Sequence, residues 1–365
     1  MPIAEGAAEI FRRDLPFHSV EESDDGRWYI IDGQRLMSVT TAFKAIAKQA
    51  LVPWAGMQAA EAAFANLPTL IVASRKKPCE RTWNRCKHDP AEICERCPCR
   101  ECRLCVQKWI GDAHARTSAR RADEGVRIHD VAEWWSYHGE TKAHDDDITG
   151  YIKAFGQFVD DYGIQPDDVL LAEALLVHRD IGAAGQTDGI LRLHAERSEL
   201  AAKDISRLLM FAGERVPWKK AQKLKLTADV LIDYKSRETH LDEAGEVKGG
   251  AKFYPENALQ LSGYRHFPVI RVKNSDLEVP MLPVDGGMVI QLRPDGYTTR
   301  LVKCDQATYE HGFLPALRTY QWLIEDGAAS VSSHTFVLPE TVAARERKAA
   351  REAAAAGEQP TSEAA

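Results

Sequence analysis

The chain has 365 residues, of which 44% are hydrophobic and 28% are charged, and its formal net charge is −7. These values are typical of a globular protein with one substantial core and an insert, or with two modest domains. The acidic balance excludes a surface coated uniformly with cations, so any contact with nucleic acid must come from a local patch. Residues 1–20 lack the apolar core of a signal peptide, and no segment is apolar enough to span a bilayer. We therefore expect a cytoplasmic protein.

The N-terminal part of the chain predicts a β-hairpin followed by helices. Residues Trp28 to Val39 alternate in polarity around Asp32-Gly33, which is a strong signal for a two-residue type I′ turn. Thr40 or Thr41 is placed to cap a helix that runs through Ala50, and a second helix rich in alanine follows.

The next segment holds seven of the eight cysteines, and their spacing indicates bound metal. An odd, crowded set of cysteines without a secretion signal makes a poor disulfide framework. Together with one histidine they could ligate two tetrahedral zinc ions, and two Cys-x-x-Cys pairs have the spacing that closes on zinc. A 4Fe-4S cluster is the alternative. The candidate ligands are Cys79, Cys86, His88, Cys94, Cys97, Cys99, Cys102 and Cys105.

Beyond this insert the pattern is helix, three strands, helix, strand, which predicts an α/β fold with a central mixed sheet flanked by helices. A charged helical segment over residues 196–225 separates the last two of the three strands. The expected elements are helices over 116–137 and 151–162, strands over 169–178, 184–193 and 227–234, a helix over 257–266, a hairpin over 287–303 and a closing helix over 307–324.

The sharpest chemical signal is Asp233-Tyr234-Lys235, which ends an apolar run. Residues two apart on a strand project from the same face, so a carboxylate and an amine lie side by side. Both types are rarely buried unless they are paired. Such a pair is suited to hold a divalent metal next to a polarised water. A structural ion pair at a strand end is the alternative interpretation.

Three further segments carry groups of compatible chemistry. Asp188 stands between glycines, where the backbone can approach a ligand closely, although a turn aspartate is the alternative. His129, on a predicted helix, is either a metal ligand or a partly buried histidine bonded to a carbonyl. Gln260 and Tyr264 share one helix face, where they contact a phosphate or a base, or simply pack against the sheet.

In this order the four segments resemble the PD-(D/E)XK nuclease superfamily, specifically its RecB-like branch, which includes phage-type exonucleases. The family pattern is a Gly-x-x-x-His helix, a Gly-x-x-Asp strand, an Asp/Glu-x-Lys strand and a Gln-x-x-x-Tyr helix. The matching segments are Gly125–His129, Gly185–Asp188, Asp233–Lys235 and Gln260–Tyr264, and the resemblance covers about residues 28–325 apart from inserts. One departure is spacing, because Asp188 and Asp233 are 45 residues apart where family members have a short hairpin.

The resemblance implies a restriction-endonuclease-like core and a metal-dependent DNA exonuclease that leaves 5′-phosphate products. One or two Mg²⁺ or Mn²⁺ ions would be held by His129, Asp188 and Asp233, since hard oxygen ligands suit these ions. Lys235 would orient the attacking water, and Glu173 would assist as an outer carboxylate. The implied catalytic residues are Asp188, Asp233, Lys235, Gln260 and Tyr264.

The resemblance also implies that the partner is DNA, in phage or bacterial recombination, replication or repair. A recombinase, a single-strand-binding protein or a helicase would be a further partner, and the bacterial host cytoplasm would be the location of a phage-encoded protein. Basic residues in and near the insert and in the charged helical segment are candidates for phosphate contact. They are Arg75, Lys76, Lys77, Arg103, Lys219 and Lys220. A non-catalytic nucleic-acid binder with a zinc module on the same fold is the alternative function.

The chain is therefore expected to have four parts. Residues 1–74 form the N-terminal hairpin and helices of the nuclease domain, 75–110 the cysteine-rich metal-binding insert, and 111–335 the nuclease core. Residues 336–365 form an Ala/Glu-rich tail that begins as an exposed helix and ends disordered. In relatives with an iron–sulfur cluster, three cysteines follow the Gln-x-x-x-Tyr helix. Only Cys304 does so here, which favours zinc in the insert.

Overall fold

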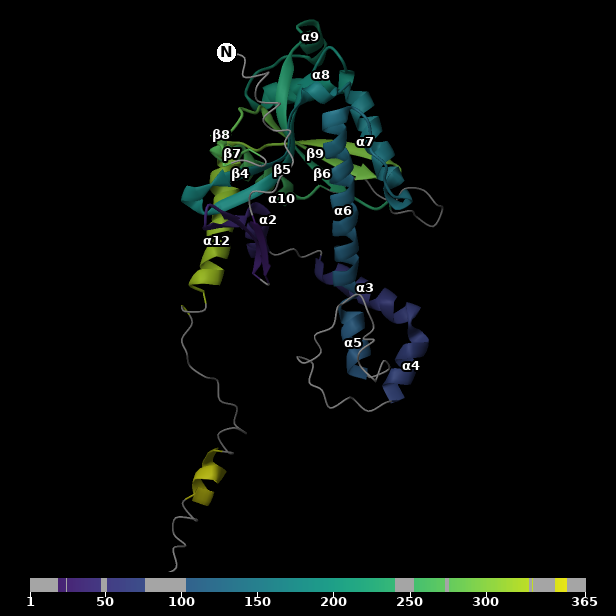
Figure 1. The fold of residues 1–365 in the computed structure, drawn as a ribbon, viewed down its shortest axis with the longest axis vertical. Helices are drawn as coiled ribbons and strands as arrows, with labels where there is room; N and C mark the ends of the chain where they lie inside the picture. The colour runs from purple at the N-terminus through teal and green to yellow at the C-terminus, as the bar shows by residue number, and fades with distance from the viewer. Residues whose placement is uncertain are drawn as a thin grey trace, which may run out of the picture. The chain divides into compact units, whose positions relative to one another are not determined.

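A mixed β-sheet is the centre of the fold in the computed structural model (Figure 1). The structure describes residues 19–23, 25–46, 51–75, 103–239, 253–272, 276–327, 330 and 345–352, without the side chains of 103–105. Within these segments the sheet has ten strands. They are β1 (Ser19–Ser23), β2 (Gly26–Ile31), β3 (Gln34–Ser38), β4 (Val169–His178), β5 (Ala183–His194), β6 (Thr227–Ser236), β7 (Val269–Arg271), β8 (Glu278–Pro280), β9 (Gly286–Arg293) and β10 (Gly296–Val302).

The strand pairing combines antiparallel hairpins with two parallel junctions. β1, β2 and β3 form an antiparallel meander, and β3 joins β5 in parallel. β4, β5 and β6 are antiparallel neighbours, whereas β6 and β9 are parallel. The hairpin partner β10 pairs with β9, while β7 and β8 extend the sheet from β4. The predicted α/β class with a mixed central sheet is confirmed.

Helices cover both faces of this sheet. α6 and α7 lie beside each other (Figure 1), and together with α8 they pack on the face that holds a large hydrophobic cluster. α10 packs on the opposite face of β6 and β9. The helices and helical turns are α2 (Val39–Ala42), η1 (Phe43–Ala45), α3 (Leu51–Ala65), α4 (Leu67–Arg75), α5 (Arg103–Gly111), α6 (Ala113–His138), η3 (Asp146–Ile148), α7 (Thr149–Tyr162), η4 (Pro166–Asp168), η5 (Arg179–Ile181), α8 (Glu199–Phe211), α9 (Trp218–Lys223), α10 (Pro255–Arg265), α11 (Gln306–Thr308), the π-helical turn η6 (Tyr309–Phe313) and α12 (Leu314–Glu325).

The strand β6 shows how sequence alternation distributes its side chains. Val230, Ile232 and Tyr234 belong to the large cluster under α6, α7 and α8. The intervening Leu231 and Asp233 therefore project from the other face, toward α10. All five side chains are buried, so β6 is a central strand covered on both faces.

Local signals explain where the main helices begin and end. α7 ends at Gly163, whose φ of 64° is the left-handed conformation that commonly terminates a helix. α8 begins after Ser198, whose hydroxyl accepts hydrogen bonds from the backbone N–H groups of Leu200 and Ala201. α8 and the short α9 occupy the segment between β5 and β6.

The helix expected to be capped by Thr40 or Thr41 differs from the prediction. It begins earlier, at Val39, and no side-chain hydrogen bond caps it. The hydroxyl of Thr41 instead accepts the backbone N–H of Arg27 at 3.0 Å, which ties this helix to β2. A Cβ at Gly26 would lie 2.4 Å from Thr41, so this contact requires glycine there. The long-range contact thus overrides the local capping preference.

Several predictions fall outside the main body or outside the described residues. Residues from Trp322 onward form a second compact unit, in which the expected exposed helix is present over residues 345–352. None of the helices in the described segments is long and apolar enough to cross a bilayer. Six of the insert's cysteines, with His88, Lys76 and Lys77, lie outside the described residues. Arg103 and Cys105 begin α5, but their side chains are not described, so the metal site of the insert stays a prediction.

Candidate functional site

Three neighbouring strands place acidic residues in one row across the sheet. Glu173 on β4 and Asp188 on β5 face each other between two consecutive pairs of the β4–β5 ladder, Ala172–Gly189 and Ala174–Thr187. Asp233 on β6 directly follows Gly189–Ile232, where the β5–β6 ladder ends. Residues opposite each other on adjacent strands lie close together, so the three carboxylates form one group.

His129 completes this group from α6, which packs against β6. Its Nδ1 lies 3.3 Å from Oε1 of Glu173 and 3.4 Å from Oδ1 of Asp188. One donor atom from each of these three residues lies within 4.8 Å of the others. Ligands on opposite sides of a Mg²⁺ ion are about 4.2 Å apart, so small side-chain movements would bring all three atoms onto one ion.

The carboxylate of Asp233 is held through only one of its oxygens. Oδ1 accepts a hydrogen bond from Nζ of Lys235 at 2.6 Å and another from Nε2 of Gln260 at 3.1 Å. Oδ2 is buried and has no hydrogen-bond partner among the described residues. A buried carboxylate oxygen without a partner is costly, and a cation beside it would offset that cost.

The end of the β5–β6 ladder also frees a backbone group that positions Asp188. The N–H of Tyr234 donates to Oδ2 of Asp188 at 2.5 Å instead of pairing with β5. The ring of Tyr234 lies edge-to-face with His129 on the other face of the strand. One residue of β6 thus orients both an acid and the imidazole of the group.

Burial and mutual charge shift the ionisation of this group. Burial lowers the pKa of His129, but the carboxylates of Asp188 and Glu173 outweigh it and raise this pKa to about 9. Burial raises the pKa of Asp188 and of Asp233, and Lys235 opposes the increase at both. A divalent cation bound beside these carboxylates would stabilise their ionised form.

Glu173 has a more central place than the sequence suggested. The sequence assigned metal ligation to His129, Asp188 and Asp233, whereas the group of compact donor atoms contains Glu173 and lacks Asp233. The φ of Glu173 is 44°, a conformation uncommon for residues other than glycine and often found at functional sites. A charged residue inside the apolar run 169–178 was the available sequence signal.

Gly185 and Tyr264 set the distance between α10 and the sheet. A Cβ at position 185 would lie 2.6 Å from Cε1 of Tyr264 and 3.1 Å from Cγ2 of Val39. Tyr264 is 3% exposed, and its hydroxyl lies 3.5 Å from Nε2 of Gln260. Glycine therefore allows the close packing that places Gln260 on Asp233, and Tyr264 contributes as a buried support. At Gly125, by contrast, a Cβ would make only an ordinary contact with Ser236.

The candidate DNA-binding lysines are not brought to this group. Lys219 and Lys220 lie on α9, which precedes the start of β6 at Thr227. Lys235 lies eight residues further along the strand, or about 26 Å at 3.3 Å per residue. Arg75 is exposed at the end of α4.

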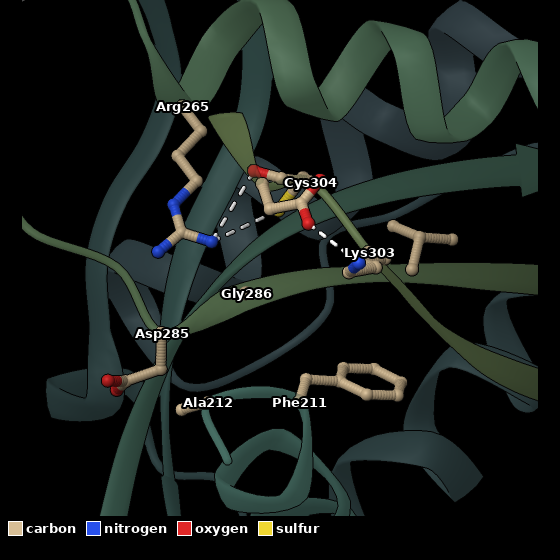
Figure 2. Close-up of a pocket in the computed structure, with 9 residues that line it drawn as sticks. Phe211, Ala212, Arg265, Asp285, Gly286, Lys303 and Cys304 are labelled. Carbon is tan, nitrogen blue, oxygen red and sulfur yellow. Dashed lines mark hydrogen bonds and ion pairs between the residues drawn. The ribbon is translucent and has the colours of Figure 1, made fainter. Parts of the chain in front are cut away.

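A separate cavity of about 180 Å³ lies near the start of β9 and the end of β10 (Figure 2). Arg265 reaches over it and donates to the carbonyl of Cys304 at 3.4 Å, with Sγ at 3.9 Å. Lys303 and Asp285 also line this cavity. None of the site residues predicted from the sequence belongs to its lining, so it is distinct from the carboxylate group.

The fold and the site together define a class, an α/β protein whose mixed sheet, flanked by helices, carries a His–Glu–Asp group beside a Lys–Asp pair. In comparisons with known proteins, no family model matches this chain and no curated protein matches its sequence. The functional assignment therefore depends on the chemistry of the site.

Proposed function

We propose that this protein is a Mg²⁺- or Mn²⁺-dependent deoxyribonuclease of the PD-(D/E)XK type that acts as an exonuclease. The observation that carries the proposal is the compact donor set of His129, Glu173 and Asp188, next to the paired Asp233 and Lys235. Metal ligands activate a water and neutralise phosphate charge, and an ammonium group beside them stabilises the charge that develops during phosphodiester hydrolysis.

The residues present fit a divalent cation. Two carboxylates and an imidazole offer ligand atoms within 4.8 Å of one another, and Asp233, whose Oδ2 has no hydrogen-bond partner among the described residues, adds a third carboxylate. When bound, such an ion lowers the pKa of a coordinated water and neutralises charge on the phosphate. The donor set is richer in oxygen than in nitrogen, which favours Mg²⁺ or Mn²⁺ over zinc.

The other residues would position the reactants. Lys235 holds its ammonium group against Asp233, from where it would orient the attacking water and stabilise charge on the phosphorane. Gln260 fixes the same carboxylate from α10, and the N–H of Tyr234 fixes Asp188. Hydrolysis then breaks the P–O3′ bond, giving a 5′-phosphate on one product and a 3′-hydroxyl on the other.

The test is digestion of end-labelled linear DNA and of circular DNA of equal length, with Mg²⁺, Mn²⁺ or Ca²⁺ and with EDTA. We expect loss of linear DNA with Mg²⁺ or Mn²⁺, intact circles, and products that carry a 5′-phosphate. Cleavage of circles would replace the exonuclease assignment by an endonuclease. DNA binding without loss under every metal would instead identify a non-catalytic nucleic-acid binder.

A further inference from the structure

The two residues before α10, Phe253 and Tyr254, are aromatic, and each lies beside an arginine. The guanidinium carbon of Arg237 is 5.8 Å from the ring centroid of Tyr254, and that of Arg300 is 5.3 Å from the ring centroid of Phe253. Both arginines are exposed, and Tyr254 is 41% exposed. We refer to Arg237, Phe253, Tyr254 and Arg300 as the arginine–aromatic ledge.

The strand register places this ledge on the same face of the sheet as Asp233. Arg300 on β10 pairs with Val289 on β9, and Val289 pairs with Asp233 on β6. Residues opposite each other in a sheet project from the same face, so Arg300 lies two strands away from Asp233, or about 10 Å. Arg237 is the first residue after β6 and lies two residues beyond Lys235. Its backbone N–H donates to the carbonyl of Leu292 on β9 at 2.9 Å, so the alternation of β6 extends to it and places it on the same side as Lys235.

The helix α10 provides a second, independent connection between the ledge and the site. Phe253 and Tyr254 immediately precede α10, and Gln260 within this helix donates to Asp233. Tyr254 and Gln260 are six residues apart, or about 9 Å along the helix axis. The ledge therefore borders the group formed by Asp233 and Lys235 on two sides.

Arg237 and Arg300 carry the positive charge of the ledge. Neither Arg237 nor Arg300 has a carboxylate partner among the residues that the structure describes. Another arginine shows the contrast: Arg35 lies 3.8 Å over the ring of Trp28, but Glu21 binds its guanidinium group. Two arginines that lack a carboxylate partner in the described segments, beside an exposed aromatic ring, complement a phosphate chain with accessible bases.

We propose that the ledge binds an unpaired nucleic-acid strand beside the reacting phosphate, with the arginines on its phosphates and Tyr254 stacked on a base. Stacking on a side chain requires a base whose face is free, as in a single strand or a frayed end, whereas bases in a duplex are already stacked. The inference rests on the proposed function in one respect, namely that Asp233 and Lys235 mark the reacting centre.

The first test measures binding of the full chain in EDTA, by fluorescence anisotropy, to labelled oligo-dT of 15 nucleotides and to a blunt duplex of 15 base pairs. Loss of one stacked base corresponds to roughly a tenfold or larger loss of affinity. We expect Tyr254→Ala to weaken binding of the oligonucleotide about tenfold and binding of the duplex much less. Tyr254→Phe keeps the ring and should bind like the wild type.

The second test measures the salt dependence of oligonucleotide binding. Each phosphate contact with a single strand contributes about 0.7 to the log–log slope. The double substitution Arg237→Ala and Arg300→Ala should therefore lower this slope by about 1.4. Arg35→Ala is the matched control. It also removes an arginine that lies over an aromatic ring, but Glu21 already neutralises the charge of Arg35, so the slope should stay unchanged.

The proposed binding of an unpaired strand by the ledge would be overturned by equal effects of Tyr254→Ala on both DNA forms, or by an unchanged slope in the double variant. This failure is separable from that of the proposed function. If the wild type degrades no DNA while the ledge variants lose strand binding, the nuclease proposal fails and the ledge stands. If the wild type degrades DNA and the ledge variants bind DNA as tightly as the wild type, the ledge proposal fails and the nuclease proposal stands.

Discussion

At the scale of single residues, Asp233 and Lys235 carry the prediction with the largest expected effect. Asp233→Asn removes the carboxylate charge that the proposed function places beside the metal, and Lys235→Ala removes the ammonium group that lies 2.6 Å from Asp233. Each should lower DNA cleavage by about 100-fold or more, because each removes charge that acts in the transition state. DNA binding in EDTA should survive in both, as measured by anisotropy beside the cleavage rate.

Asp229→Asn is the matched control for this experiment. Asp229 lies on the same strand, and its carboxylate makes a paired hydrogen bond with Arg192 at 2.8 Å for each contact. Its loss removes an ion pair of β6 without touching the His129, Glu173 and Asp188 group. We expect near wild-type cleavage. A loss as large as that of Asp233→Asn would indicate that these charges stabilise the strand and do not act on the substrate.

Glu173 allows a direct test of which residues hold the metal. If Glu173 is a ligand with His129 and Asp188, Glu173→Gln should weaken binding of Mn²⁺ at least tenfold, measured by isothermal titration calorimetry without DNA. Asp229→Asn serves again as the control. Unchanged Mn²⁺ affinity in Glu173→Gln would return Glu173 to the assisting role that the sequence suggested.

At the scale of elements, the contact between β5 and α10 depends on one glycine. Gly185→Ala would place a Cβ 2.6 Å from the ring of Tyr264, a buried residue of α10. Overpacking of this kind costs about 1–3 kcal/mol of the free energy of unfolding. We also expect reduced cleavage, because a shift of α10 moves Gln260 away from Asp233.

Gly156 within α7 is the matched control for this prediction. A Cβ there meets nothing within 4 Å, so Gly156→Ala should stabilise the helix by about 0.5–1 kcal/mol. Urea unfolding of both variants measures the two effects. A Gly185→Ala protein as stable and as active as the wild type would show that α10 can move without consequence for the site.

At the scale of the whole molecule, the cysteine-rich insert yields a prediction from sequence alone. Purified protein should contain about two equivalents of zinc and be colourless, because two Cys-x-x-Cys pairs and eight candidate ligands suit two tetrahedral sites. Mass spectrometry of metals and the visible spectrum provide the measurement. Stoichiometric iron in a brown protein would establish the cluster alternative.

The sequence by itself determined the main core strands and the faces on which their side chains lie. The apolar run over residues 169–178 predicted β4 with its observed bounds, and the predicted strands over 184–193 and 227–234 lie within two residues of β5 and β6 at each end. The spacing in Asp233-x-Lys235 correctly predicted two side chains close enough for a hydrogen bond. These features are local, since they depend on alternation and turn chemistry within a few residues.

Only the tertiary structure decided which residues meet. Glu173 faces Asp188 because of the register between β4 and β5, and this register includes an irregularity near Leu171 that alternation does not reveal. The three-residue strands β7 and β8 carry too few positions for a periodic signal. The ledge arises from the residue after β6, from β10 and from the two residues before α10, which are distant in sequence and meet only through sheet pairing and packing. Register and packing depend on interactions between distant segments, so local sequence patterns leave them undetermined.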